Sequence, residues 1–276
     1  MYQKKDKIER AKLSPNELYR EFQTISKLGL QEILLLSGED RNNTSIEYIG
    51  QAIKSASNFF STIGIEIYPL DVDEYSYLHR QGADFVSIYQ ETYSKDNYAK
   101  CHLSGPKTDY LYRLNAHERA IQGGIRGVTF GSLLGLGDFR NDIFATGCHA
   151  YLIQMKYPHT EISLSVPRLR SFLNCKSLNK LPTTERHLLQ TMLALRIFLP
   201  FATINISTRE KSIFRDNVIG LVANKISAEV KTSVGGHSEK KGDEQFYISD
   251  KRSVNEIHNA IIRKGLQPVY SNHIRI

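Results

Sequence analysis

Short apolar runs alternate with longer amphipathic stretches along most of the chain. The strand-like runs lie near residues 33–36, 65–68, 85–89, 127–131, 162–166, 203–207 and 225–229. Helical stretches follow them, near residues 45–60, 73–81, 108–122, 138–155, 184–198, 211–221 and 253–264. Strands separated by helices of this length are parallel and are joined by right-handed crossovers. The alternation therefore predicts an α/β fold with one shared sheet, most economically a (β/α) barrel of the TIM type.

The first element along the chain is a helix rather than a strand. Residues 14–15 (Ser-Pro) open this helix, apolar residues recur at helical spacing from Leu18 to Leu28, and Gly29 ends it. A closed barrel of eight strands needs one more strand than the seven found here. We therefore predict an incomplete barrel, with residues 1–276 as one partial barrel domain that ends in a tail helix and end segment over 250–276.

Composition narrows the class of protein. Hydrophobic residues make up 41% of the chain and charged residues 24%, which is typical of a soluble globular protein. No apolar run approaches the roughly 20 residues that span a bilayer, and the N-terminus has no signal-peptide pattern. We expect a cytoplasmic protein without a membrane partner. The net charge of +7 would suit nucleic acid, but the basic residues are scattered, so we expect no nucleic-acid partner.

Side chains that commonly hold metals do not cluster in the sequence. Cys101, Cys148 and Cys175 are far apart, and the nine histidines form no H-x-x-x-H pair. The sequence therefore predicts no metal ligand, and the absence of a G-x-S-x-G motif leaves no catalytic residue assigned. We interpret His102, His117 and His187 as surface or helix-face residues.

Polar residues follow the predicted strands at their carboxyl ends, where parallel α/β folds gather functional groups. The segments are 37–40 (SGED), 90–93 (QETY), 132–138 (SLLGLGD), 167–170 (PRLR), 208–210 (TRE) and 231–236 (KTSVGG). Charges of both signs suit a zwitterionic ligand, because Arg binds a carboxylate and an acid such as Glu39 or Glu91 binds an ammonium group. Each segment alone is equally compatible with a helix N-cap or a surface ion pair, and Glu39 precedes a helix whose dipole favours an acid.

Several of these segments, taken in order, resemble one protein family. The motifs are LLLSGED, IYQETY, the run at 105–114, GSLLGLGDFR, SVPRLR, NISTRE and the final GLQPV. Together they resemble the aromatic-amino-acid lyases of the radical S-adenosylmethionine superfamily, in particular the tyrosine lyases of thiamine biosynthesis. The resemblance extends from about Ile8 to the C-terminus. It implies S-adenosylmethionine as a cofactor and a four-iron four-sulfur (4Fe-4S) cluster.

The resemblance also implies roles in cofactor binding for individual residues. Ser37, Gly38 and Glu39 resemble the turn that holds the methionine part of S-adenosylmethionine. Glu91 and Arg113 resemble the residues that grip its ribose or its carboxylate, and the segment from Gly131 to Leu136 resembles the one that packs on adenine.

A second set of residues is implied to bind the substrate. By the resemblance, Arg209 anchors the carboxylate of the amino acid, Ser227 assists it, and Arg168 and Arg170 line the same mouth. The implied reaction is cleavage of the Cα–Cβ bond of tyrosine to 2-iminoacetate (dehydroglycine) and p-cresol. The implied protein partner is the thiazole synthase protein.

The chain departs from the family at its N-terminus. The family carries a C-x-x-x-C-x-x-C loop after its first strand, and this sequence contains no such motif. A basic run that follows that loop in the family begins here almost directly after Met1. We therefore expect a truncated barrel of doubtful activity. It would lack the cysteines that hold the cluster, so it could bind S-adenosylmethionine and substrate at best. We also expect it to associate through its two unpaired sheet edges.

Three other functions fit parts of the pattern. The tyrosine lyases of hydrogenase maturation carry further cluster cysteines in an added C-terminal domain, whereas the last cysteine here is Cys175. Tryptophan lyases stay possible, because no residue that binds the aromatic ring is assigned. A non-catalytic fragment or interaction partner is the alternative from another class.

Overall fold

The computed structural model describes residues 10–169 and 183–271. They form one parallel sheet of seven strands, arranged in the order of the chain from β1 to β7. The strands are β1 Glu32–Leu36, β2 Thr62–Glu66, β3 Phe85–Ser87, β4 Gly127–Phe130, β5 Glu161–Ser165, β6 Thr203–Ile206 and β7 Lys225–Ile226. Within the described residues β1 and β7 are the two ends of the row, which confirms the predicted incomplete barrel.

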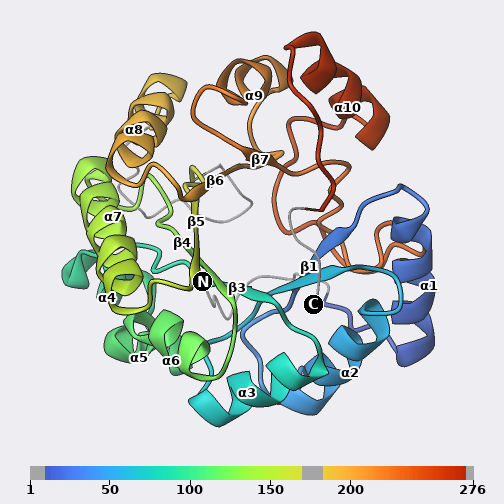
Figure 1. Cartoon of the computed structure of the whole chain (residues 1–276). Helices are drawn as coiled ribbons and strands as arrows, with labels where there is room; N and C mark the ends of the chain where they lie inside the picture. Colours follow the sequence, from blue (N-terminus) through green and yellow to red (C-terminus); the bar gives the residue numbers. More distant parts are fainter. Residues whose placement is uncertain (1–9, 170–182, 272–276) are drawn as a thin grey trace.

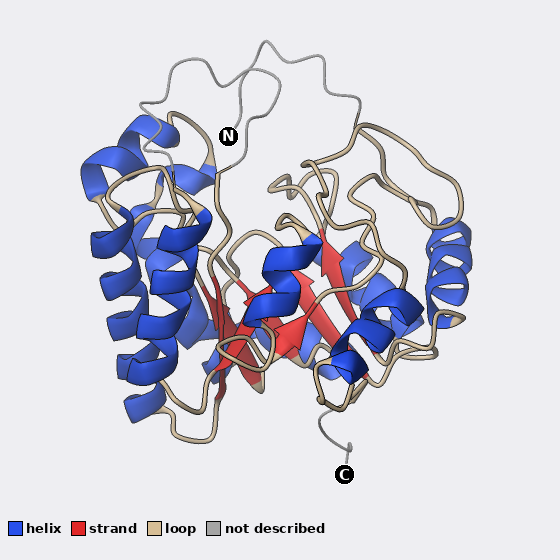
Figure 2. Cartoon of the chain, turned by 90° about the horizontal axis from the view of Figure 1, so that it is seen from above, coloured by secondary structure: helices blue, strands red, loops and turns tan. Residues whose placement is uncertain are grey.

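The helices form an outer ring around the sheet (Figures 1 and 2). They are α1 Pro15–Ser26, α2 Ile46–Ala56, α3 Val72–Gln81, α4 Lys95–Cys101, the 3-10 helix η1 Pro106–Thr108, α5 Tyr110–Leu114, α6 Ala116–Gln122, α7 Phe139–Lys156, α8 Glu185–Phe198, α9 Ser212–Val218 and α10 Val254–Arg263. Capping boxes fix the starts of α1 and α10, at Ser14 with Glu17 and at Ser253 with Glu256. In the part of the chain that the structure describes, no helix is long and apolar enough to cross a membrane.

The largest differences from the sequence-based prediction are at β2, at the stretch 95–122 and at β7. Strand β2 begins three residues before the predicted range 65–68, because Thr62 pairs with Glu32 at the start of β1. The predicted helix over 108–122 is divided into η1, α5 and α6, and α4 was not predicted. Strand β7 has only two residues of the predicted range 225–229, and Glu229 there adopts a positive φ of 49°. The prediction that residues 1–276 form one domain stays a prediction.

The two faces of the sheet carry different side chains. A Cβ atom added at Gly64 would lie 2.1 Å from the ring of Phe85, so both residues face the inside of the partial barrel. Strand alternation then places Glu66 and Ser87 inside as well. The outward positions are apolar and pack under the helices, among them Ile63, Ile65, Val86, Val128 and Leu164. The hydrophobic core therefore lies between sheet and helices, and the inner face is free to carry polar groups.

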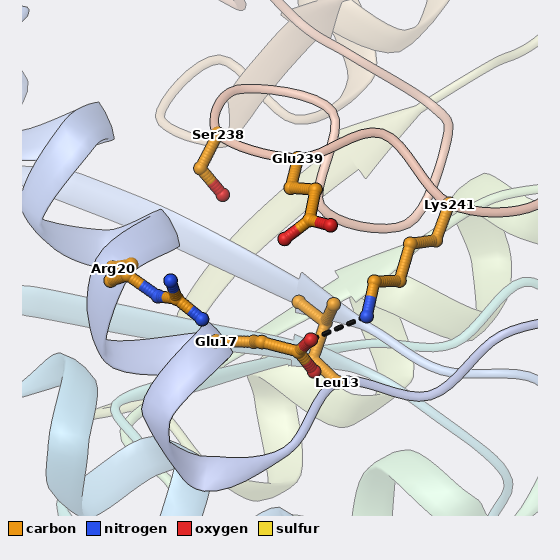
Figure 3. Close-up of a pocket in the computed structure, with 6 residues that line it drawn as sticks. All are labelled: Leu13, Glu17, Arg20, Ser238, Glu239 and Lys241. Carbon is orange, nitrogen blue, oxygen red and sulfur yellow. Dashed lines mark hydrogen bonds and ion pairs between the residues drawn. The ribbon is translucent and has the colours of Figure 1, made fainter.

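Contacts between α1 and the loop after β7 connect the two ends of the row. The carboxylate of Glu21 accepts hydrogen bonds from the backbone N–H and Nδ1 of His237, at 2.9 and 3.0 Å, and from the N–H and hydroxyl of Ser238, at 2.8 and 2.6 Å. Lys241 forms an ion pair with Glu17 beside a cavity of about 290 Å³ (Figure 3). Among the residues that the structure describes, side-chain contacts of α1 with the loop after β7 thus connect the two sides of the gap between β7 and β1.

Candidate functional site

Short bridges extend the sheet beyond the carboxyl ends of three strands. Glu91 pairs with Ser132, and Leu134 pairs with Arg168. The N–H of Leu133 donates to the carbonyl of Glu91 at 2.8 Å, and the N–H of Leu134 donates to the carbonyl of Pro167 at 2.9 Å. The loops after β3, β4 and β5 therefore form one continuous layer, and the sequence-predicted residues on them lie on neighbouring positions.

Four charged side chains converge at this end of the barrel. The Nζ of Lys107 lies 3.1 Å from Oε1 of Glu39 and 2.7 Å from Oε1 of Glu91. The Nη1 of Arg113 lies 2.9 Å from Oε1 of Glu39, and its Nη2 lies 3.8 Å from Oε1 of Glu91. Its Nε donates to the carbonyl of Tyr89 at 2.7 Å. We call Glu39, Glu91, Lys107 and Arg113 the charge cluster.

Both carboxylates of the charge cluster are ionised at neutral pH. Burial raises the pKa of Glu91, but the nearby Lys107 and Arg113 more than offset this and hold that pKa at about 2. Burial likewise opposes ionisation of Glu39, and the same two cations lower its pKa. Two carboxylates and two cations give a neutral group with separated charges. Such a group can bind both ends of a zwitterion.

The backbone of Glu91 is held in an uncommon conformation. Its φ is 70°, in the left-handed region where residues other than glycine cost of order 1–3 kcal/mol. The hydrogen bond from Leu133 and the bridge to Ser132 hold the residue there. This conformation aims the side chain of Glu91 at Lys107 instead of along the strand.

The turn after β1 lies beside the charge cluster. The N–H of Ser37 donates to the carbonyl of Glu66 at 3.1 Å, which continues the β1–β2 ladder by one residue. Gly38 has no positive φ, and a Cβ atom built on it would meet no atom within 4 Å. Neither the backbone nor the packing therefore requires glycine at this position. The open side of the turn suits close approach by a ligand.

Two inward-facing residues were missed by the sequence analysis, namely Glu66 and Tyr89. Burial raises the pKa of Glu66 to about 7, the charge of Glu91 adds to the effect, and Arg209 opposes it. Burial and the charge of Glu66 also raise the pKa of Tyr89. Arg209 thus lies at the same end of the barrel as Glu91. The acid inside the apolar run IEIY was the available signal for Glu66.

Arg209 and Ser227 lie on the loops after β6 and β7. The guanidinium of Arg209 stacks over the ring of Phe246, 3.7 Å from its centroid. The hydroxyl of Ser227 is buried and has no hydrogen-bond partner among the residues that the structure describes. A buried hydroxyl of this kind needs a partner, and a polar ligand would supply one. The substrate roles of both residues stay predictions.

The remaining predicted residues have protein contacts of their own. Arg168 binds the carboxylate of Glu210, with Nε 2.9 Å from Oε1, and also donates to the carbonyl of Thr183. A Cβ atom at Gly131 would lie 2.1 Å from the carbonyl oxygen of Ser165 and 2.5 Å from the Tyr89 ring, so packing alone requires glycine there.

For Arg168, Arg170, Gly131 and Leu136 the ligand roles rest on the resemblance and stay predictions. Leu136 is partly exposed in the same loop. Arg170 lies outside the described residues.

Lys107 was also missed, although it lies in the 105–114 run that carried part of the resemblance.

Two of the three histidine interpretations need correction. His102 and His117 are buried, and His117 stacks on Phe130 with ring centroids 3.9 Å apart. The faces of their helices turn inward to the core, which sequence spacing alone did not reveal.

The residues present do not fit an iron–sulfur cluster. Over residues 10–169 and 183–271, no three His, Cys, Asp or Glu side chains are grouped so that they could hold a metal. Cys101 is buried at the end of α4, Cys148 lies on α7, and Cys175 lies outside those ranges. The open turn at Gly38 and the charge cluster, in contrast, fit the amino-acid part of S-adenosylmethionine.

The partial barrel and its charged carboxyl-end mouth define an α/β protein of the TIM-barrel type, with a polar candidate site at the ends of its strands. Two structures of the FeFe-hydrogenase maturase HydG are similar to the chain, with TM-scores of 0.92 at 32% identity and 0.89 at 31% identity, the second from Carboxydothermus hydrogenoformans. They match 98% and 97% of this chain, which spans 61% and 62% of theirs. Methylornithine synthase (PylB) shares the fold, with a TM-score of 0.68 at 20% identity.

Curated relatives identify the family within this class. The chain is 34% identical to the 2-iminoacetate synthases of Escherichia coli K12 and Salmonella typhimurium LT2, over 97% of its own length and 71% of theirs. Residues 165–267 match the Biotin and Thiamin Synthesis associated domain. The chain belongs to the radical S-adenosylmethionine family of aromatic-amino-acid lyases that includes 2-iminoacetate synthase.

Proposed function

We propose that this chain binds S-adenosylmethionine and tyrosine as part of a tyrosine lyase that forms 2-iminoacetate and p-cresol in thiamine biosynthesis. The observation that carries the proposal is the convergence of the charge cluster with Glu66 and Arg209 at one end of the barrel. The similarity to 2-iminoacetate synthases over 97% of the chain supports it. The thiazole synthase protein is the proposed partner, and the cytoplasm the proposed location.

The charge cluster and the turn at Gly38 would hold S-adenosylmethionine. The carboxylate of Glu39 accepts hydrogen bonds from its ammonium group, and Lys107 and Arg113 bind its carboxylate. Glu91, ionised through neutral pH, accepts from ribose hydroxyls. When bound, S-adenosylmethionine supplies the radical chemistry of this family. The described residues do not fit the iron–sulfur cluster that this chemistry needs.

The inward-facing residues would hold tyrosine. Arg209 binds the carboxylate of the amino acid, since its planar guanidinium is already oriented by the ring of Phe246. Glu66 lies close enough to feel the charge of Arg209, so it can accept a hydrogen bond from the ammonium group of the same amino acid. The unpartnered hydroxyl of Ser227 adds a third contact.

Calorimetric titration of the full chain with S-adenosylmethionine and with L-tyrosine tests this function. The Gly38→Val variant is expected to fold normally, because its side chain enters open space, and to bind S-adenosylmethionine at least tenfold more weakly. The Gln51→Val variant, on the exposed side of α2, is the matched control and keeps the affinity. If neither ligand binds the folded chain at millimolar concentration, the proposed function is wrong.

A further inference from the structure

Helix α7 is apolar on two sides. Its inner side, with Ile143, Ala150 and Ile153, packs against the sheet and belongs to the core. Its outer side carries Phe144, Tyr151, Leu152 and Met155, of which between 41% and 75% of the surface is exposed. A helix that is apolar all round is normally buried all round. The outer side of α7 therefore has the composition of a covered surface.

The neighbouring helix α8 enlarges this apolar surface (Figure 1). Leu193, Ile197 and Phe198 are exposed on α8, and Phe201, directly after it, is 93% exposed. The rings of Tyr151 and Phe198 lie 5.5 Å apart and join the two helices into one patch. We call the patch the α7/α8 face. Its members are Phe144, Tyr151, Leu152, Met155, Leu193, Ile197, Phe198 and Phe201.

The α7/α8 face contains both a hollow and projecting side chains. The hollow lies between the helices and has a volume of about 220 Å³. Gly147 forms part of its floor, where a Cβ atom would lie 3.3 Å from the ring of Phe198. Ile197 is 80% exposed and projects from the helix beside the hollow. A face with a hollow and a matching projection is complementary to a second copy of itself.

The size and chemistry of the face also fit a second copy. The centre of the face carries one charged residue, Arg196, between residues 144 and 155 on α7 and between residues 190 and 197 on α8. The guanidinium of Arg196 is bound to the carbonyls of Val222 and Ala202. Eight large side chains exposed by more than a third offer on the order of 900 Å². A stable interface buries about 800 Å² per partner, and permanent homodimers use the most apolar ones.

We propose that the α7/α8 face is a homodimer interface, in which α7 and α8 of two copies pack against each other around a twofold axis. The projecting Ile197 of each copy enters the hollow of the other. The inference does not depend on the proposed ligands, because the face lies on the outer ring of helices and not at the carboxyl ends of the strands.

Light scattering coupled to size exclusion, with sedimentation from 1 to 100 µM, tests the interface. The wild-type chain is expected to have the mass of a dimer. The Phe144→Glu and Ile197→Glu variants are expected to be monomers, with association weakened at least thirtyfold, because each would bury a charge in the apolar centre. The Ile213→Glu variant, on the exposed side of α9, is the matched control and stays dimeric.

Other modes of association give different results. If copies join through the strand edges of β1 and β7, Phe144→Glu and Ile197→Glu leave the mass unchanged and the proposal is overturned. A wild-type chain that is monomeric at 100 µM overturns it as well.

A second measurement uses Cys148, one turn from Phe144 on α7. Peptide-level mass spectrometry should show its maleimide labelling at least fivefold slower in the wild type than in Ile197→Glu. Equal labelling rates would contradict burial of this face.

Discussion

Two carboxylic acids at the same end of the barrel have opposite properties. The pKa of Glu91 is about 2, because Lys107 and Arg113 more than offset its burial. The pKa of Glu66 is about 7, because it is buried and faces the charge of Glu91. Glu66 makes no side-chain hydrogen bond to any residue that the structure describes. One acid is thus permanently charged, whereas the other gains and loses a proton near neutral pH, as groups at functional sites often do.

Tyrosine binding is expected to depend on the proton of Glu66. If the ammonium group of tyrosine binds ionised Glu66, binding below pH 7 must release a proton, and affinity falls as the pH decreases. With a pKa of about 7 in the free protein, the Kd at pH 5.5 should be about twentyfold higher than at pH 7.5. Calorimetry in buffers of different ionisation enthalpy measures both quantities.

The matched variants for this experiment are Glu66→Gln and Glu185→Gln. Glu66→Gln should bind tyrosine more weakly at pH 7.5 and lose the dependence on pH, with no proton released. Glu185→Gln, in the first turn of α8, should behave as the wild type. An unchanged pH profile in Glu66→Gln would show that another group is responsible. Retained binding of S-adenosylmethionine separates this result from a failure of the proposed function.

The predictable part of the site is the part carried by loop motifs. Glu39 and Glu91 were predicted from segments that follow strands, Arg113 was implied by the resemblance through the 105–114 run, and the structure brings the three together. Lys107 joins them from η1, and nothing in its local sequence indicates that its Nζ bridges two distant carboxylates. Which residues of a strand face inward depends on its pairing register, so Glu66 could be recognised only once β2 was paired with β1.

At the scale of elements, α1 packs its apolar side on the core and is bound on its polar side by a loop that is distant in sequence. The buried carboxylate of Glu21 accepts four hydrogen bonds from His237 and Ser238. Burial alone would raise the pKa of Glu21, but these donors lower it to about 2. Because that pKa lies below the usual carboxyl value, the interaction stabilises the fold above about pH 4.5 and is lost as the pH falls towards 2.

Replacing Glu21 is expected to detach α1 from the loop. The Glu21→Ala variant leaves two backbone N–H groups and two side-chain donors without their acceptor, which costs about 3 kcal/mol at pH 7. Chemical denaturation measures the loss, and hydrogen exchange should show α1 and residues 237–238 losing protection together. Glu17→Gln, which breaks the more exposed contact with Lys241, should have a clearly smaller effect. Equal effects of the two variants would contradict the proposed role of Glu21.

The elements themselves were predicted better than their ends. Each of the seven predicted runs overlaps a strand, because burial on the outer face demands β-branched and large aliphatic residues such as Ile63 and Val86. Their ends are set by partners, since β2 starts where Glu32 of β1 begins to pair. The division between α5 and α6 at Asn115 has no clear signal in a stretch that is helical on both sides.

Across the whole molecule, the hydrophobic layer between sheet and helices contains the buried His117 and the half-buried His149. Burial lowers the pKa of His117 to about 3 and that of His149 to about 4. The Nε2 of His117 contacts the carbonyl of Thr129, and the Nδ1 of His149 contacts the hydroxyl of Tyr93. Both rings pack against Phe130. The core therefore depends on both histidines being neutral.

The stability of the whole fold should accordingly depend on pH through His149. Its folded pKa of about 4 lies below the unfolded value of 6.5, so the unfolded chain binds the proton first and stability is lost as the pH falls from 6.5 towards 4. Glu66, whose pKa is raised, acts in the opposite direction, so the profile of the wild type alone does not isolate the histidine. In His149→Gln, which keeps a polar group beside Tyr93, the free energy of unfolding relative to wild type should rise by about 2 kcal/mol between pH 7.5 and pH 5. In the exposed His159→Gln variant, the free energy of unfolding should differ from that of the wild type by the same amount across this pH range. If His149→Gln also shows a difference that does not change with pH, the ring of His149 is already hydrated in the folded protein.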